Sequence, residues 1–142
     1  MAHWYGIRDG DWRAWAMLND HYSARHYRDG RRPAKVMGPG EYMLLMTLDS
    51  LAVFGWLRNR RDDDQDGISC ALFRNVGPHR SSDLIREADQ LAWERWEDRR
   101  HFTYVNPRKV RSLNPGYCFL QAGWTRVGRS KSGLHLLAIE GS

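Results

Sequence analysis

The sequence predicts one α/β domain, with a mixed sheet of about six to seven strands flanked by helices. Three observations lead to this expectation. A chain of 142 residues suits one domain, which at this length buries roughly 68–70% of the surface that the unfolded chain exposes. Hydrophobic residues make up 42% and charged residues 27%, as in folded globular proteins rather than disordered ones. Finally, strand-like and helix-like segments alternate along the chain, which predicts a sheet with helices packed on it.

Each expected element follows from a local pattern. Expected strands are short apolar runs bounded by turn residues, and expected helices repeat apolar residues every three or four positions. The strongest helix has an apolar stripe from Leu84 to Trp96, and Ser81 or Ser82 is expected to cap its first turn. The expected order is a strand over 3–7, a helix over 12–25, strands over 42–48, 51–57 and 68–73, a helix over 81–96, a strand over 101–105, a short helix over 115–122, and strands over 124–128 and 134–139.

The charge balance favours anionic partners. Lys and Arg total 22 against 17 Asp and Glu, a formal charge of +5, and most of the cations are arginine. Because the arginine fork binds phosphate in two places, DNA or another nucleic acid, a phosphate-bearing cofactor and an acidic surface are all allowed. The alternative is a basic surface that only keeps the protein soluble.

Cysteine usage and hydropathy bear on the compartment. Cys70 and Cys118 are far apart, so neither a zinc site nor a disulfide framework is indicated, and a reduced cytoplasmic protein is expected. No apolar run is long enough to cross a membrane, and the first residues lack the layout of a signal peptide. We therefore expect no membrane partner.

The segment between the strand over 68–73 and the helix that follows it is a candidate anion site. A strand-to-helix connection places the free N–H groups of the helix N-terminus at the end of the strand, where phosphate can bind. The loop here runs from Arg74 to Ser82.

The element order, with Phe73-Arg-Asn-Val-Gly77 before the long helix and Asn114-Pro-Gly-Tyr-Cys-Phe-Leu-Gln-Ala-Gly-Trp124 near the end, resembles the GNAT superfamily of N-acyltransferases over nearly the whole chain. The resemblance implies acetyl-CoA or another acyl-CoA as cofactor. It also implies that the pantetheine arm lies between two splayed parallel strands, 68–73 and 101–105, with the pyrophosphate at the start of the long helix.

The same resemblance identifies candidate cofactor contacts. The family's phosphate loop, R/Q-x-x-G-x-G/A, is matched in part by Arg74-x-x-Gly77-x-His79. An ordinary strand-to-helix loop is the alternative. The candidate cofactor-binding residues are Phe73, Arg74, Val76, Gly77, Ser81, Ser82 and Asn114.

The C-terminal segment departs from the family at the general acid. Gly123-Trp124 resembles the Gly-Phe that ends the last GNAT helix, and by that register the family's tyrosine falls at Phe119. A phenyl ring cannot protonate the departing CoA thiolate. Tyr117 or Tyr104 is the candidate substitute, and a packed core tyrosine is the alternative.

A narrower resemblance rests on His21-Tyr22-Ser23, together with the segments 104–107 and 114–116. These are similar to phage Mom-type DNA-modification proteins. That likeness implies alteration of adenine bases in DNA, by a protein that a phage or prophage encodes and that acts in the host cytoplasm.

The His-Tyr-Ser segment offers two chemistries. His21 can take a proton from an attacking amine with Tyr22 beside it, or His21 and Tyr22 can bind a metal with Asp20. Neighbouring residues on a helix point about 100° apart, so the three side chains converge only where the helix ends. The alternative is a helix-end histidine bonded to backbone and a half-buried tyrosine.

An enzyme that modifies a base in a duplex must also receive it outside the stack. Trp12, Trp15, Trp56 and Tyr42 are candidates by residue type, although core packing explains most aromatic residues. Arginine clusters over 25–32 and 58–61 suit phosphate contact, unless they are solvated loops.

Two functions remain open at the level of sequence. The first is an acyl-CoA-dependent N-acyltransferase, in the narrower version a Mom-like modifier of DNA adenine, acting by direct attack on the thioester. The alternative is a non-catalytic module of the same fold that binds nucleic acid or a protein partner, because fold does not fix function. Binding of acyl-CoA separates the two.

Overall fold

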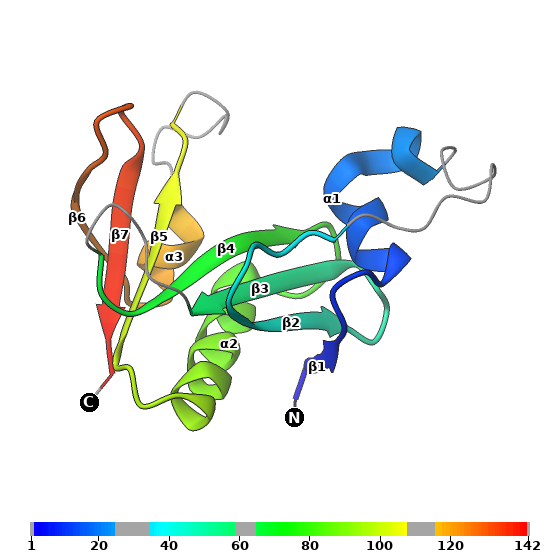
Figure 1. Cartoon of the computed structure of the whole chain (residues 1–142), viewed down its shortest axis with the longest axis horizontal. Coiled ribbons are helices and arrows are strands. Elements are labelled where there is room, and N and C mark those ends of the chain that lie inside the picture. Colours follow the sequence, from blue (N-terminus) through cyan, green and yellow to red (C-terminus); the bar gives the residue numbers. More distant parts are fainter. Residues whose placement is uncertain (1, 25–34, 59–64, 108–115, 142) are drawn as a thin grey trace.

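A seven-stranded mixed sheet in the order β1-β2-β3-β4-β5-β7-β6 organises the molecule (Figure 1). The computed structural model describes residues 2–24, 35–58, 65–107 and 116–141, and the side chains of 19–24 lie outside this description. The elements are β1 (Trp4–Ile7), α1 (Trp12–Ala24), β2 (Glu41–Thr47), β3 (Ala52–Arg58), β4 (Ile68–Asn75), α2 (Ser81–Arg95), β5 (Arg100–Val105), α3 (Tyr117–Gln121), β6 (Thr125–Arg129) and β7 (His135–Glu140).

The sheet consists of two antiparallel arms that meet at one short parallel pair. Strands β1 to β4 pair in sequence order, and β7 lies between β5 and β6. Only Ile68↔His101 and Ser69↔Phe102 join β4 to β5, and beyond these two pairs the strands diverge (Figure 1). We call this divergence the splay and its paired end the vertex.

A bulge in β4 lies just past the vertex. The pairing with β3 passes from Gly55↔Leu72 to Trp56↔Cys70, so Ala71 is an extra residue without a partner on β3. The bulge changes which face each side chain occupies, since Cys70 and Phe73 both contact the main core while Leu72 packs on the opposite face.

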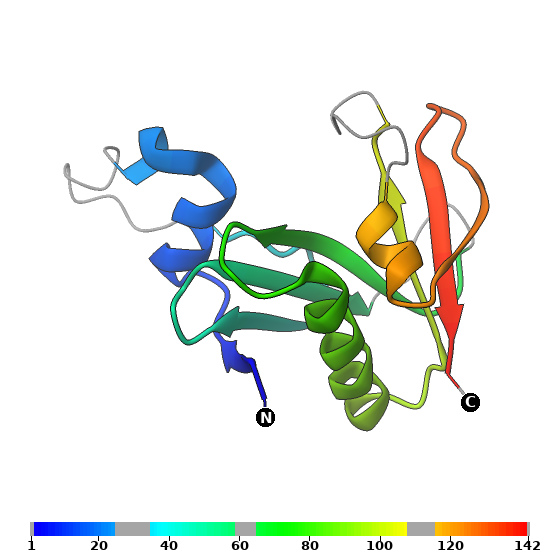
Figure 2. The same ribbon diagram turned by 180° about the vertical axis from the view of Figure 1, so that it is seen from behind.

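Helices cover the two faces of the sheet unequally. Helices α2 and α3 pack on one face, over the main core that includes Phe54, Trp56 and Trp124 (Figure 2). Helix α1 packs on the other face of the first arm, where Ala14 is fully buried against β2 and β3. In the described ranges, no helix is both long and apolar enough to cross a membrane.

The predicted fold class and element order are confirmed, and the ends of each element differ by a few residues. The predicted cap of α2 is wrong. Arg80 is the N-cap, in an extended conformation, and no side chain caps this end. The reason is that Ser81 already lies inside the helix, where its Oγ accepts a hydrogen bond from the Asn75 amide, and Ser82 is buried.

Candidate functional site

Within the described strands, the splay leaves one edge of β4 without a partner. Past the last backbone pair, Thr103 Oγ1 donates a hydrogen bond to the Cys70 carbonyl oxygen over 2.9 Å, and this bond is a final link between the arms. From the Ala71 bulge onward, the described part of β4 pairs with β3 on one side and with no strand on the other. Its backbone groups can therefore bond to an extended amide chain laid between the arms.

The N-terminus of α2 lies at the end of β4 and has unused donors. In the first turn, the N–H groups of Asp83 and Leu84 both donate to the Arg80 carbonyl oxygen, at 3.1 and 3.2 Å. Because no side chain among the described residues caps this end, the first backbone N–H groups and the positive end of the helix dipole are available to an anion.

The Asn75 side chain fixes the loop that leads into α2. Its Nδ2 donates to the His79 carbonyl oxygen at 2.7 Å and to Ser81 Oγ at 3.0 Å. Its Oδ1 accepts the Gly77 N–H at 3.0 Å. One amide therefore holds both sides of the loop, a contact that the sequence reasoning missed.

Gly77 is required by a close approach to the β2–β3 turn. A Cβ at Gly77 would lie 2.8 Å from the Leu51 Cβ, and the neighbouring Val76 N–H donates to the Leu51 carbonyl oxygen at 2.8 Å. The absence of a side chain at 77 thus has a packing reason that is independent of any ligand.

Most of the predicted cofactor-binding residues gather at this end of β4. Phe73 is half-buried, with its ring 5.4 Å from Phe54, while Arg74 is half-exposed and Val76 is exposed. Gly77, Ser81 and Ser82 follow in the loop and the first turn of α2, and the Ser82 side chain is buried. Asn114 lies outside the described residues.

Helix α3 places Phe119 and Tyr117 differently. It begins after Gly116, which packs closely over Leu137 on the second arm. Phe119, at which the sequence resemblance predicts the general-acid position, is buried, with its ring 6.0 Å from the Phe73 ring at the end of β4. Tyr117 is 54% exposed at the first helical position, and Tyr104 lies on the opposite face of β5.

The His-Tyr-Ser segment forms the last part of α1, and the side chains of Asp20, His21 and Tyr22 lie outside the described residues. Their convergence on a base or metal site therefore stays a prediction. Across residues 2–24, 35–58, 65–107 and 116–141, no group of three His, Cys, Asp or Glu residues could hold a metal ion.

The geometry bears on two further predictions, which are base stacking on Trp56 and phosphate contact by Arg58. Trp56 cannot receive a base, because it is fully buried and its Nε1 donates to the Ala88 carbonyl oxygen. Arg58 forms exposed ion pairs with Asp98 and Glu41, which balance part of its charge, and its contact with phosphate stays a prediction. The other arginines of the two clusters lie outside the described residues.

A buried polar group at the vertex was not predicted. Asp89 accepts a hydrogen bond from the Trp124 indole at 2.9 Å and lies 2.7 Å from His101 Nδ1. The His101 ring is fully buried, stacks on Trp93 and contacts Trp56, and its Nε2 has no hydrogen-bond partner among the described residues.

Burial raises the pKa of the Asp89 carboxyl, and the hydrogen bonds from His101 and Trp124 hold that rise back. His101 is the β5 partner of Ile68, so the pair ties α2 to the vertex. The sequence did contain one indication of this buried group, because Asp89 lies on the apolar stripe of the predicted helix.

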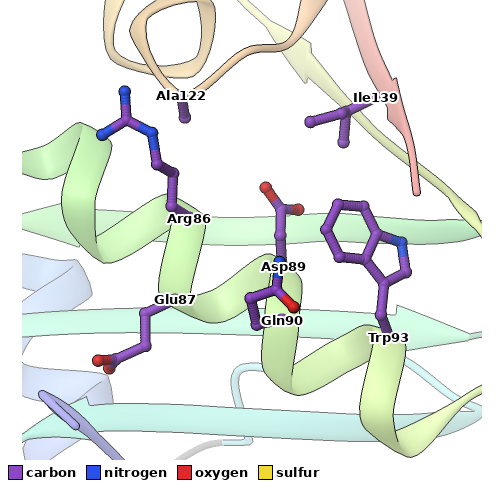
Figure 3. Close-up of a pocket in the computed structure, with 7 residues that line it drawn as sticks. All are labelled: Arg86, Glu87, Asp89, Gln90, Trp93, Ala122 and Ile139. Atoms are coloured by element: carbon purple, nitrogen blue, oxygen red, sulfur yellow. The ribbon is translucent and has the colours of Figure 1, made fainter. Parts of the chain in front are cut away.

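A pocket of about 360 Å³ lies beside this group, between α2 and the α3–β7 side of the second arm (Figure 3). Asp89 and Trp93 point toward Ala122 and Ile139, whereas the Glu87 carboxylate points away and accepts the backbone N–H groups of His3 and Trp4. The pocket lies along the middle of α2 and is separate from the helix N-terminus.

Comparison with known proteins identifies the fold. No family model and no curated protein match the sequence. Among solved structures, the chain is similar to the aminoglycoside acetyltransferase AAC(6')-Ib in complex with coenzyme A, with a TM-score of 0.66, 13% identity, and 97% of this chain and 94% of that chain covered. The same enzyme has also been solved with coenzyme A and kanamycin, where the identity is 14% and the TM-score 0.65.

A GNAT-family acetyltransferase from Bacillus anthracis matches 98% of this chain and 95% of its own, at 9% identity and a TM-score of 0.57. A domain from Methanocaldococcus jannaschii matches at 11% identity, a TM-score of 0.56, and 96% of each chain. The narrower likeness to Mom-type proteins stays a prediction. From the sheet order, the splay and these matches, the chain has the GNAT acetyltransferase fold.

Proposed function

We propose that the chain is an acyl-CoA-dependent N-acyltransferase that uses acetyl-CoA or another acyl-CoA. The observation that carries the proposal is the parallel β4–β5 pair, which separates after two residues and leaves one edge of β4 without a strand partner in the part of the chain that the structure describes. The solved neighbours that contain coenzyme A support it, since they share this fold.

The chemical groups at the splay fit such a donor. Pantetheine carries amide groups, which the open edge of β4 can bond as a neighbouring strand would. The uncapped start of α2 offers N–H donors and positive potential to a pyrophosphate, and Arg74 and Arg80 add full charges close by in sequence. The Asp83 carboxylate in the same turn forms an ion pair with Arg86, which reduces its repulsion of an anion.

Transfer in this proposal is direct. The acceptor nitrogen attacks the thioester carbonyl carbon, the new C–N bond forms as the C–S bond breaks, and the sulfur leaves as a thiolate. Cys70 and Cys118 are unsuited to act as nucleophiles, because burial raises the pKa of both thiols and keeps them protonated. The proposed base is His21, beside Tyr22, and the proposed acid for the thiolate is Tyr117, since Phe119 has no proton to give.

The deciding experiment is calorimetric titration with acetyl-CoA of the wild type, Ser81→Pro and Ser81→Ala. Proline is tolerated at the first helical position after an extended residue, and it removes one N–H donor there. The alanine variant keeps that N–H and removes only the hydroxyl.

We expect micromolar binding in the wild type. Ser81→Pro should bind roughly tenfold more weakly, or worse, because a hydrogen bond to a charged group is lost. Ser81→Ala should stay close to the wild type. No binding at millimolar acetyl-CoA would refute the proposal, and equal binding by all three proteins would refute the phosphate position.

The narrower proposal concerns the acceptor, which the Mom-type resemblance identifies as adenine in DNA. It rests on His21-Tyr22-Ser23 and on the positive net charge. Plasmid DNA from cells that express the chain should contain a modified adenosine detectable by mass spectrometry, and the His21→Ala variant should lack it. Unmodified DNA from cells with abundant folded protein would count against this acceptor.

A non-catalytic binding module is the second candidate, and the burial of Phe119 favours it. The residue at the family's acid position packs against Phe73 and Trp124 in the core. Under this alternative, the wild type transfers no acetyl group, so Tyr117→Phe has no transfer activity to lower. Under the acyltransferase proposal, it lowers acetyl transfer and leaves acetyl-CoA binding intact.

A further inference from the structure

The excess positive charge of the chain belongs entirely to its last part. Residues 100–142 contain seven Lys or Arg residues and one acid, Glu140, which is a formal charge of +6. Residues 1–99 contain 15 cations and 16 acids, a formal charge of −1. The last part includes β5, α3, β6 and β7, and its described residues carry Arg100, Arg126, Arg129 and Lys131 against Glu140, a formal charge of +3.

The single acid of this arm is far from its open end. Glu140 is the β7 register partner of Arg100, next to the vertex, whereas the β6–β7 turn lies at the opposite end of these strands (Figure 1). The single acidic side chain of residues 100–142 therefore lies away from the turn.

Strand β6 presents those cations along an exposed edge. It is the last strand of the sheet, and all five of its residues are exposed. Arg126 and Arg129 lie on it, and the exposed Lys131 follows in the turn. We call these three residues the cationic edge.

A bulge aligns the two arginines on one face. The pairing with β7 passes from Arg126↔Leu137 to Gly128↔Leu136 and Arg129↔His135, so Val127 is an extra residue. In a regular strand, residues three apart point to opposite faces. Here both arginines are opposite β7 residues of the same face, two positions apart, which is roughly 7 Å along the strand.

The pKa of His135 is affected by its burial and by these two arginines. It is 8% exposed, and its Nδ1 has no hydrogen-bond partner among the described residues. Burial, followed by the charges of Arg129 and Arg126, lowers the pKa of His135. The imidazole therefore remains neutral at physiological pH, and the local positive charge comes from the cationic edge.

We propose that the cationic edge of β6 binds the phosphodiester backbone of a nucleic acid. A line of cations along an extended strand matches a line of phosphates, and arginine binds phosphate in two places. Protein interfaces depend on buried apolar or aromatic anchors, and β6 offers only Val127. This proposal does not depend on acyl transfer, because binding needs no acyl-CoA.

The test is fluorescence anisotropy with a labelled 20-nucleotide single-stranded DNA, the RNA of the same sequence and the DNA duplex, each from about 50 to 200 mM salt. The variant, which we call the hairpin variant, is Arg129→Gln with Lys131→Gln. The matched control is Arg8→Gln with Lys35→Gln, which removes the same charge from exposed positions on the first-arm side. Thermal melts verify that all proteins are folded.

We expect the hairpin variant to bind roughly 20-fold more weakly near 0.1 M salt, since each phosphate contact with a single strand contributes roughly 0.7 to the slope of log K against log salt. The slope itself should fall by about 1.4, and the control should behave as the wild type. Preference among the three nucleic acids then identifies which one the edge fits.

Four outcomes would overturn the proposal. The wild type could bind none of the three probes at 50 mM salt, in which case the cations serve only to keep an edge strand from pairing with other chains. The control could lose as much affinity as the hairpin variant. A polyglutamate peptide could bind as tightly as DNA. Finally, the hairpin variant could lose affinity for CoA but not for DNA, which would assign the edge to the cofactor phosphate.

Discussion

A carboxylate buried on the apolar side of a helix is costly unless it is paired, and Asp89 has two partners. Breaking such a pair by removing one member leaves a buried charge that is only partly compensated. At the scale of single residues, loss of His101 would therefore destabilise the protein mainly because the buried Asp89 carboxylate would lose its partner.

The first prediction concerns His101→Phe. This substitution keeps a ring in the aromatic surroundings and removes the partner of Asp89, so we expect a loss of roughly 3 kcal/mol in the free energy of unfolding at pH 7. Adding Asp89→Asn should recover part of the loss. Urea unfolding measures both, and equal stability of wild type and His101→Phe would show that the pair contributes nothing.

Asp89 determines how the loss of stability in His101→Phe varies with pH. Burial raises the pKa of Asp89 above 3.8, so the folded state keeps its proton more readily than the unfolded state. The contribution of Asp89 to stability therefore falls as pH rises from 3.8 through the folded pKa. The His101→Phe deficit should be larger at pH 7 than at pH 4.5.

The second prediction concerns His135 and has the opposite sign. Its folded pKa lies below 6.5, so the unfolded state binds the proton more readily. The contribution of His135 is fully present above pH 6.5 and is lost as pH falls through the folded value. A His135→Gln variant should show a shallower loss of melting temperature between pH 6.5 and 5 than the wild type, and parallel curves would contradict this.

At the scale of elements, the loop between β4 and α2 is shaped by the β2–β3 turn as much as by its own sequence. Gly77 packs closely against Leu51. The Asn75 amide donates hydrogen bonds to the His79 carbonyl oxygen and to Ser81 Oγ. An anion at this helix start would be held by backbone whose position depends on the approach of Gly77 to Leu51 and on the bonds from the Asn75 amide to the loop backbone.

The third prediction tests the match between Gly77 and Leu51. A methyl group at 77 would lie 2.8 Å from the Leu51 Cβ, so Gly77→Ala should destabilise the protein by roughly 1–3 kcal/mol and weaken acetyl-CoA binding. Adding Leu51→Ala should not rescue it, because the Cβ remains, whereas Leu51→Gly should restore part of both properties. Rescue by Leu51→Ala would mean that the contact is not the cause.

Single helices and strands were predictable because each depends on the residue pattern of one short segment. The apolar stripe from Leu84 to Trp96 determines which side of α2 is buried, and that side packs on the sheet as expected. The position of the strand-to-helix loop followed from the same reasoning. The splay itself was expected through family resemblance, since no residue pattern indicates where two parallel strands stop pairing.

The missed features depend on residues distant in sequence. Asp89 and His101 meet only because α2 folds back over β5, and Ser81 fails as a cap because the helix begins one residue earlier than predicted, with Arg80 as its N-cap. The bulge at Val127 was also invisible, because it is defined by its pairing with β7.

At the scale of the whole molecule, the two arms share two backbone pairs, the Thr103–Cys70 bond and the packing of α2 and α3. A donor bound between the arms would contact both of them. Ligand binding should therefore stabilise the complete fold and not one arm alone.

The fourth prediction follows from that linkage. Acetyl-CoA at 100 times its dissociation constant adds about 2.7 kcal/mol to the stability, which for a chain of this length raises the melting temperature by roughly 5–10 °C. Ser81→Pro should need a higher concentration for the same shift. Differential scanning calorimetry measures this, and two separate transitions with only one shifted would contradict a shared response.

The short parallel pair also has a consequence for how the chain folds. Strands β1 to β4 pair in sequence order with their neighbours, so the first arm can form through hairpins that close short loops. The β4–β5 join instead closes a loop that spans all of α2 and adds only two backbone pairs. We therefore expect docking of the second arm to be the late step of folding, with the amides of Ile68 to Ser69 and His101 to Phe102 gaining their hydrogen-exchange protection last.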